Sequence, residues 1–88
     1  MEKIIITLTQ EIENSPIITS ITFSDSNTLF GFSMRLVIVL RENGIEFAAI
    51  PTSTKNSKSF SIKNSTIENL ENLLNEQFNS NMLDIQIK

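Results

Sequence analysis

Side chains able to do acid–base chemistry are few in this chain, and they fall mainly into two pairs of carboxylates. Glu11 and Glu13 lie in a polar stretch, while Glu68 and Glu71 are three residues apart, a spacing that places them on one face of a helix. Paired carboxylates can exchange protons with a substrate or bind a divalent cation. Because both pairs sit among polar residues, we expect them to be solvated surface groups.

The sequence lacks the residues that nucleophilic and metal-dependent catalysis usually require. The 88 residues contain no histidine and no cysteine, which removes the usual proton shuttle near neutral pH, the commonest zinc ligands and any disulfide. The serine hydroxyls have no histidine to activate them, and the two glycines form no phosphate-binding loop. The sequence therefore predicts a protein that is not an enzyme and has no cofactor, no metal ion and no small-molecule substrate.

The cationic side chains are the remaining candidates for a binding site. The net charge is −3, yet residues 51–66 carry Lys55, Lys58 and Lys63 and no acid. Arg35 and Arg41 are predicted to share one face of an apolar strand. Because lysine and arginine neutralise phosphates, these five residues are the candidate nucleic-acid-binding residues, for DNA or RNA. Two alternatives stay open: the lysines belong to a solvated loop, and the arginines reach water or pair with acids across a dimer.

Runs of alternating or β-branched apolar residues predict most of the chain to be strands. The expected strands cover residues 3–8, 17–23, 32–41, 45–50 and 59–62, and a short last strand follows the helix at 83–87. The run at 32–41 is apolar on both faces near its middle, which is typical of a central strand. Asn43 and Gly44 are expected to form a hairpin turn to residues 45–50, and Pro51 ends that strand.

One helix is expected near the C-terminus. Ser65 and Glu68 have the spacing of a capping box, and apolar residues follow at helical spacing. These apolar residues are Ile67, Leu70, Leu73, Leu74 and Phe78. The predicted fold class is α+β: a small antiparallel β-sheet of four to six strands with one C-terminal α-helix packed on it, in a single domain over residues 1–88.

A single helix covers one face of a sheet, which leaves apolar side chains on the other face exposed. The residues predicted there are Ile5, Ile18, Val37 and Val39. We therefore expect a homodimer that buries them. No apolar run is long enough to cross a bilayer, and the N-terminus lacks the pattern of a signal peptide, so a cytoplasmic protein without a membrane partner is expected.

Several short motifs between residues 18 and 79 resemble a known family. Residues 47–51 (FAAIP) are similar to the phenylalanine-x-alanine-methionine-proline signature of the stage V sporulation protein G (SpoVG) family. As in that family, a glycine turn (Gly44) precedes the signature and a phenylalanine (Phe60) stands nine residues after the proline. Residues 62–66 (IKNST) resemble the family's helix start, and residues 20–23 (SITF) resemble one of its strands.

The resemblance implies a twisted antiparallel sheet with a C-terminal helix, a homodimer built through the sheet, and nucleic-acid binding that regulates gene expression, as in sporulation and septation. By position it assigns the family's basic loop to residues 52–59, with Lys55 and Lys58. The sequence departs from the family at Thr52 and Ser53, where the family has a lysine and an arginine, and in a helix that carries acids only. The alternative hypothesis is a protein-interaction module, of a kind that phages and plasmids encode, that binds a host protein through its sheet or acidic helix.

Overall fold

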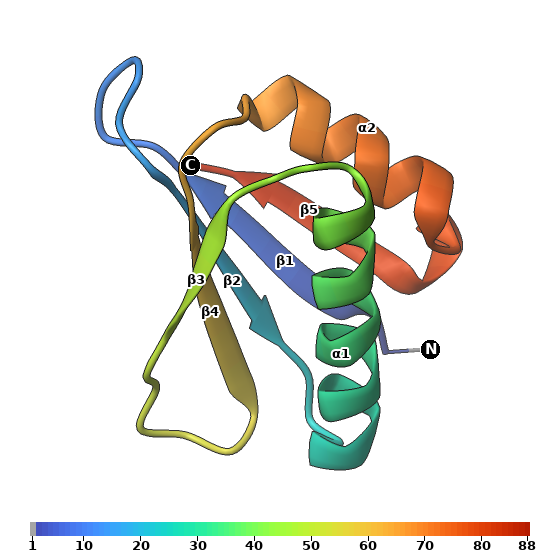
Figure 1. Ribbon diagram of the computed structural model, residues 1–88. Helices are drawn as coiled ribbons and strands as arrows, with labels where there is room; N and C mark the ends of the chain where they lie inside the picture. Colours follow the sequence, from blue (N-terminus) through green and yellow to red (C-terminus); the bar gives the residue numbers. More distant parts are fainter. Residues whose placement is uncertain (1) are drawn as a thin grey trace.

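The computed structural model describes residues 2–88, which form one five-stranded sheet and two helices (Figure 1). The strands are β1 (Ile4–Thr9), β2 (Ile17–Thr22), β3 (Phe47–Ile50), β4 (Ser57–Ile62) and β5 (Leu83–Ile87). The helices are α1 (Ser26–Glu42) and α2 (Ile67–Gln77), and a 3-10 turn, η1 (Ser80–Met82), leads into β5. Within these residues no helix is both long enough and apolar enough to span a bilayer.

The sheet has the strand order β3-β4-β2-β1-β5 and is mixed. Three of its pairings are antiparallel, whereas β1 and β5 run parallel, with Ile6 opposite Ile85. The parallel pair requires the long return that α2 and η1 provide, because parallel strands cannot be joined by a tight turn. The expected α+β class is confirmed, but the expected purely antiparallel sheet is wrong.

Both helices pack on the same face of the sheet, and the other face is open (Figure 1). Alternate residues of β1 and β2 point under the helices, where Ile6, Leu8, Ile17 and Ile21 are fully buried. Burying a side chain of this size stabilises a fold by roughly 1.5–3 kcal/mol. The expectation of a sheet covered on one side is therefore met by two helices and not by one.

Helix α1 occupies the segment where a central strand was expected, so the prediction of a strand at residues 32–41 is wrong. Asp25 caps the helix, because its carboxylate accepts a hydrogen bond from the backbone N–H of Asn27. Leu29, Leu36 and Leu40 recur at helical spacing and are buried against the sheet. Residues 43 and 44 end this helix and do not form a hairpin turn.

The remaining elements lie close to their expected positions. Four strands start or end within two residues of the predicted bounds, and β3 begins two residues late at Phe47 and ends at Ile50, directly before Pro51. Helix α2 is confirmed, but its cap is Thr66, whose hydroxyl accepts a hydrogen bond from the N–H of Asn69 over 3.1 Å. The capping box expected from Ser65 and Glu68 is therefore wrong by one residue.

Candidate interaction surfaces

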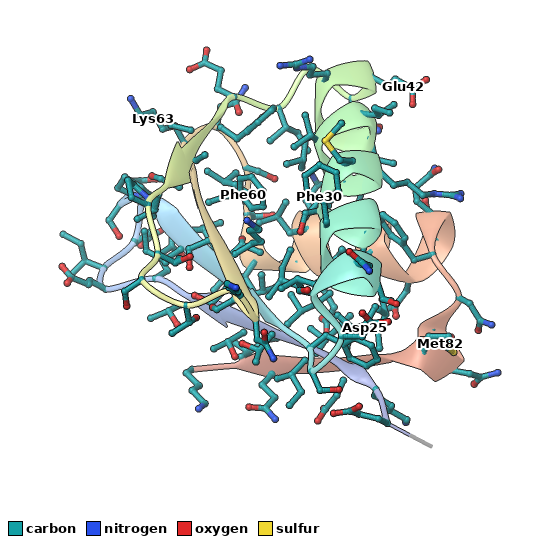
Figure 2. The ribbon with its side chains drawn as sticks, turned by 90° about the horizontal axis from the view of Figure 1, so that it is seen from below. Asp25, Phe30, Glu42, Phe60, Lys63 and Met82 are labelled. Carbon is teal, nitrogen blue, oxygen red and sulfur yellow. The ribbon has the colours of Figure 1, made fainter. Side chains whose placement is uncertain are left out.

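The three lysines of the expected basic segment are separated by strand β4. Lys55 lies in the loop before this strand, and Lys63 follows its last residue, near the opposite end (Figure 2). A strand rises about 3.3 Å per residue, so the six residues of β4 alone set these two positions on the order of 15–20 Å apart. Lys58 stands opposite Ile21, which is buried beneath the helices, so the Lys58 side chain leaves the sheet on the helix-covered face. The structure does not bring the three ammonium groups together.

The two arginines lie on different sides of α1, so the expectation that they share a face of a strand is wrong. The Arg35 guanidinium lies 5.4 Å from the ring centroid of Phe78, just after α2, and donates a hydrogen bond to the carbonyl oxygen of Gln77 over 3.3 Å. The Arg41 guanidinium lies 5.8 Å from the ring centroid of Phe47, in β3. Each arginine therefore packs on an aromatic ring at a different edge of the helix.

The four residues expected at a dimer interface are also divided between surfaces. Ile5 and Ile18 lie on the open sheet face and are 38% and 37% exposed. Val39 is only 5% exposed in a single chain and belongs to the core beneath α1, so its assignment to a dimer interface is wrong. Val37 is half-buried on α1 and packs against that core, so it cannot share the sheet face with Ile5.

The open sheet face carries small, mostly uncharged side chains. Thr7 stands opposite Ser20, and Ser20 stands opposite Ser59, with 3.2 Å between the two serine hydroxyl oxygens. The charged residues in the five strands are Lys58 and Asp84. Within residues 2–88 the six phenylalanines belong to the helices, the loops or the helix-covered face. The strands therefore present no aromatic side chain on this face for a single strand of nucleic acid to stack on, although Phe23 lines the hollow at one end of it.

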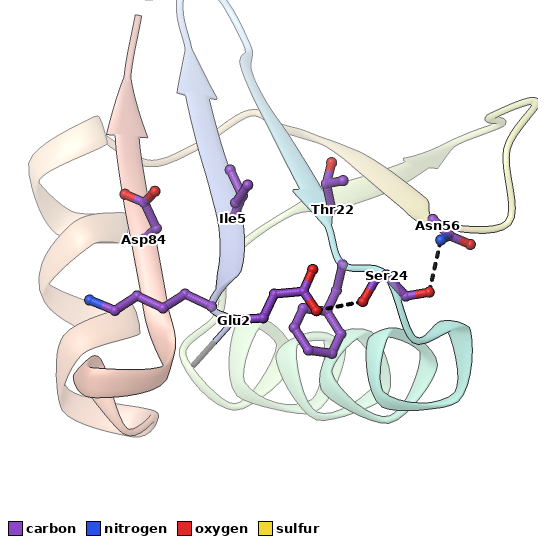
Figure 3. A pocket seen from close by; sticks show the side chains of 8 residues that line it. Glu2, Ile5, Thr22, Ser24, Asn56 and Asp84 are labelled. Atoms are coloured by element: carbon purple, nitrogen blue, oxygen red, sulfur yellow. Dashed lines mark hydrogen bonds between the residues drawn. The ribbon is translucent and has the colours of Figure 1, made fainter.

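A hollow at one end of the open face is braced by hydrogen bonds (Figure 3). The Ser24 hydroxyl donates to the Glu2 carboxylate, and the Asn56 amide donates to the Ser24 carbonyl oxygen over 2.8 Å. These bonds tie the N-terminal segment to the loops before α1 and before β4. Asp84 adds a second carboxylate, but residues 2–88 contain no group of three or more acidic, histidine or cysteine residues that could hold a metal ion. The hollow is best explained as a structural junction.

Three of the eight large apolar side chains that are exposed among residues 2–88 lie on α1. Phe30, Met34 and Ile38 are spaced four residues apart, which aligns them along one side of the helix. They are 58%, 52% and 54% exposed, respectively. Figure 2 shows Phe30 between the two ends of α1, which Asp25 and Glu42 mark. We call these three residues the α1 stripe. Their spacing of four residues is present in the sequence, but it was not recognised because this segment was predicted to be a strand.

Comparisons with models of protein families, with curated proteins and with solved structures found no match. The resemblance to the SpoVG family therefore stays a prediction. One part of the order on which it depends, a strand and a hairpin before residue 47, is a helix and its C-terminal cap in this structure.

Proposed function

We propose that this protein is a protein-interaction module that binds a protein partner through the α1 stripe. The observation that carries the proposal is that Phe30, Met34 and Ile38 are each more than half exposed on one side of one helix. Surface apolar residues scattered singly are common, but an aligned group is typical of a binding surface. Phenylalanine and methionine are also enriched in protein–protein interfaces.

Polar groups border the α1 stripe and would surround a bound partner. Asn27 and Arg41 precede and follow it along the same side of the helix, since helical residues turn by about 100° each. Arg41 is exposed and is held over the Phe47 ring, which orders its guanidinium before binding. An apolar centre inside a polar rim is the usual arrangement of an interface whose central residues contribute most of the binding energy.

Homodimerisation through the open sheet face is a second part of the proposal. The neighbours of Ile5 and Ile18 in the sheet are small hydroxyl side chains, apart from Asp84 beside Ile5, and such small side chains allow another flat sheet to approach closely. This face carries little charge, so a second copy would meet little electrostatic repulsion. Light scattering should give the mass of a dimer for the wild-type protein and that of a monomer for an Ile5→Asp/Ile18→Asp variant, and a monomeric wild type would refute this part.

The α1 stripe is tested against a control variant that loses exposed apolar side chains elsewhere on the surface. Tagged wild-type protein, a Phe30→Ser/Met34→Ser/Ile38→Ser variant and an Ile12→Ser/Ile87→Ser control are incubated with nuclease-treated lysate of the native organism. Ile12 and Ile87 are 71% and 52% exposed, so the control also loses exposed apolar surface. A partner retained by wild type and control but lost by the stripe variant supports the proposal. Equal retention by all three proteins refutes it.

The nucleic-acid hypothesis predicts a different result. Fluorescence anisotropy with labelled DNA and RNA should show binding that weakens steeply as salt rises, because binding releases counterions from the phosphates. Replacement of Lys55, Lys58 and Lys63 by alanine should then abolish it. The separation of these lysines along β4 leads us to expect no such binding, and salt-dependent binding lost in the triple variant would favour the regulator over the interaction module.

A further inference from the structure

A second apolar feature, distinct from the α1 stripe, lies beside α1. A hollow of about 370 Å³ opens where α1 meets the segment that follows α2. Its walls include Phe32 from α1, Phe78 from the end of α2, and Met82 from η1. The Phe32 and Phe78 rings pack with their centroids 4.6 Å apart. This volume lies toward the low end of small-molecule sites, which span roughly 300–1,000 Å³.

Gly31 keeps one side of this hollow free of side-chain atoms. It lies inside α1, where glycine is less stable than alanine by roughly 0.5–1 kcal/mol. Its backbone angle φ is not positive, and a Cβ atom built on it would meet nothing within 4 Å among the described residues. Neither backbone conformation nor close packing therefore explains the glycine, whereas an open wall for a ligand does.

Arg35 supplies a positive charge to an otherwise apolar site. Its exposed side chain lines the hollow, and the Phe78 ring beneath the guanidinium fixes its position. A guanidinium has five N–H donors, and the hydrogen bond to the Gln77 carbonyl oxygen uses one of them. The remaining donors can take a carboxylate, which binds a guanidinium through two parallel hydrogen bonds.

We propose that this hollow binds a small aliphatic carboxylate, such as a medium-chain fatty acid. The chain lies against Phe32, Phe78 and Met82, and the carboxylate pairs with Arg35. Met82 is 37% exposed and unbranched, so it can adjust to chains of different length. Charge complementarity selects a carboxylate over a neutral ligand, and the apolar walls select an aliphatic chain over a polar metabolite. This site is independent of the partner proposed for the α1 stripe.

The proposal is tested by titrating isotope-labelled protein with hexanoate, octanoate, decanoate and decanol and following amide shifts by NMR. The carboxylates are kept below their micelle concentrations and decanol below its solubility limit. Each added CH2 group should tighten binding about fourfold until the hollow is full. Decanol should bind at least roughly tenfold more weakly than decanoate, because it lacks the charge-assisted pair. The largest shifts should fall on Gly31, Phe32, Phe78 and Met82. Equal affinity for decanol and decanoate, or shifts elsewhere, would overturn the proposal.

Three variants test the apolar part and the charged part of the site separately. Gly31→Leu should fill the hollow and weaken decanoate binding at least tenfold, while the exposed position leaves the fold intact. Arg35→Gln should weaken decanoate but not decanol. Arg41→Gln is the matched control, since it removes an arginine that also lies over a phenylalanine ring but on the other side of α1, and it should change neither. Unchanged decanoate binding by Gly31→Leu and Arg35→Gln, or tighter binding of a leucine-terminated peptide than of decanoate, would refute the fatty-acid site.

Discussion

The backbone N–H of Ile45 donates a hydrogen bond to the carbonyl oxygen of Leu40 over 2.9 Å, and this bond closes the C-terminus of α1. Between them, Gly44 donates to the carbonyl oxygen of Arg41 over 3.1 Å and has a φ of 67°. The two bonds form a Schellman motif, which satisfies carbonyl groups that the last helical turn leaves free. The left-handed residue reverses the chain and directs Ile45 into the core, where β3 can begin.

Replacing Gly44 with alanine should destabilise the protein by about 1–2 kcal/mol, because a Cβ atom in the left-handed conformation approaches the following carbonyl oxygen. Chemical denaturation measures the change in the free energy of unfolding. Gly31→Ala, inside α1, is the matched control, and it should stabilise the protein by roughly 0.5–1 kcal/mol because the φ of Gly31 is not positive. A Gly44→Ala variant as stable as the wild type would show that the motif does not hold this end of α1.

Leu40 and Ile38 provide a direct test of α1 itself. In a strand the two side chains would share a face, whereas in the helix Leu40 is fully buried and Ile38 is 54% exposed. Leu40→Ala should therefore cost about 2–5 kcal/mol, and Ile38→Ala should change the free energy of unfolding by no more than roughly 0.5 kcal/mol. Similar large losses for both variants would favour the strand that the alternation in sequence predicts.

The strands could be predicted from sequence because each has one clear local signal. The α1 segment instead carries two conflicting signals, one for a helix and one for a buried strand. Its inward residues Leu29, Leu36 and Leu40 have helical spacing, while the outward α1 stripe makes the segment apolar all round. An apolar run without clear periodicity fits either a helix or a buried strand, and the β-branched residues 37–39 favoured the strand. The mostly apolar stretch over residues 29–40, which Gly31, Ser33 and Arg35 interrupt, exceeds the usual length of a strand, and this length was the available signal for a helix.

The candidate site was harder to predict than the fold because it depends on which face each residue takes. Arg35 and Arg41 are six residues apart, an even number that places them on one face of a strand but on different sides of a helix. Lys55 and Lys63 are close in sequence, but an extended strand between them sets them far apart. The parallel pairing of β1 with β5 joins the two ends of the chain, and no local pattern encodes it.

The start of α2 gives a prediction about which residue caps the helix. Thr66→Ala should destabilise the protein by about 1 kcal/mol, because it leaves the N–H of Asn69 without its acceptor. Ser65→Ala should cost no more than a few tenths of a kcal/mol, since the Ser65 hydroxyl accepts only an exposed bond from the Asn69 side chain. Thermal or chemical unfolding compares the two variants. A larger loss for Ser65→Ala would restore the capping box expected from the sequence.

The N-terminal cap of α1 makes stability depend on pH. The Asp25 carboxylate accepts hydrogen bonds from the hydroxyl of Thr28 over 2.8 Å and from the backbone N–H of Asn27 over 3.1 Å, and these bonds lower the pKa of Asp25 below its ordinary value. A carboxylate with a lowered pKa in the folded protein stabilises the fold above its unfolded pKa, and this contribution disappears as pH falls through the folded value. Asp25→Asn keeps an oxygen that can cap the helix but does not titrate.

The free energy of unfolding of the wild type and of Asp25→Asn should therefore converge as the solution is acidified below about pH 4. The other carboxylates titrate in both proteins and cancel in the difference. Because the Thr28 hydroxyl is the first cause of the lowered pKa, Thr28→Ala should shrink the pH-dependent part of that difference. A difference that stays constant across the acidic range would mean that Asp25 caps α1 equally well when protonated, and that its charge does not contribute to holding the helix.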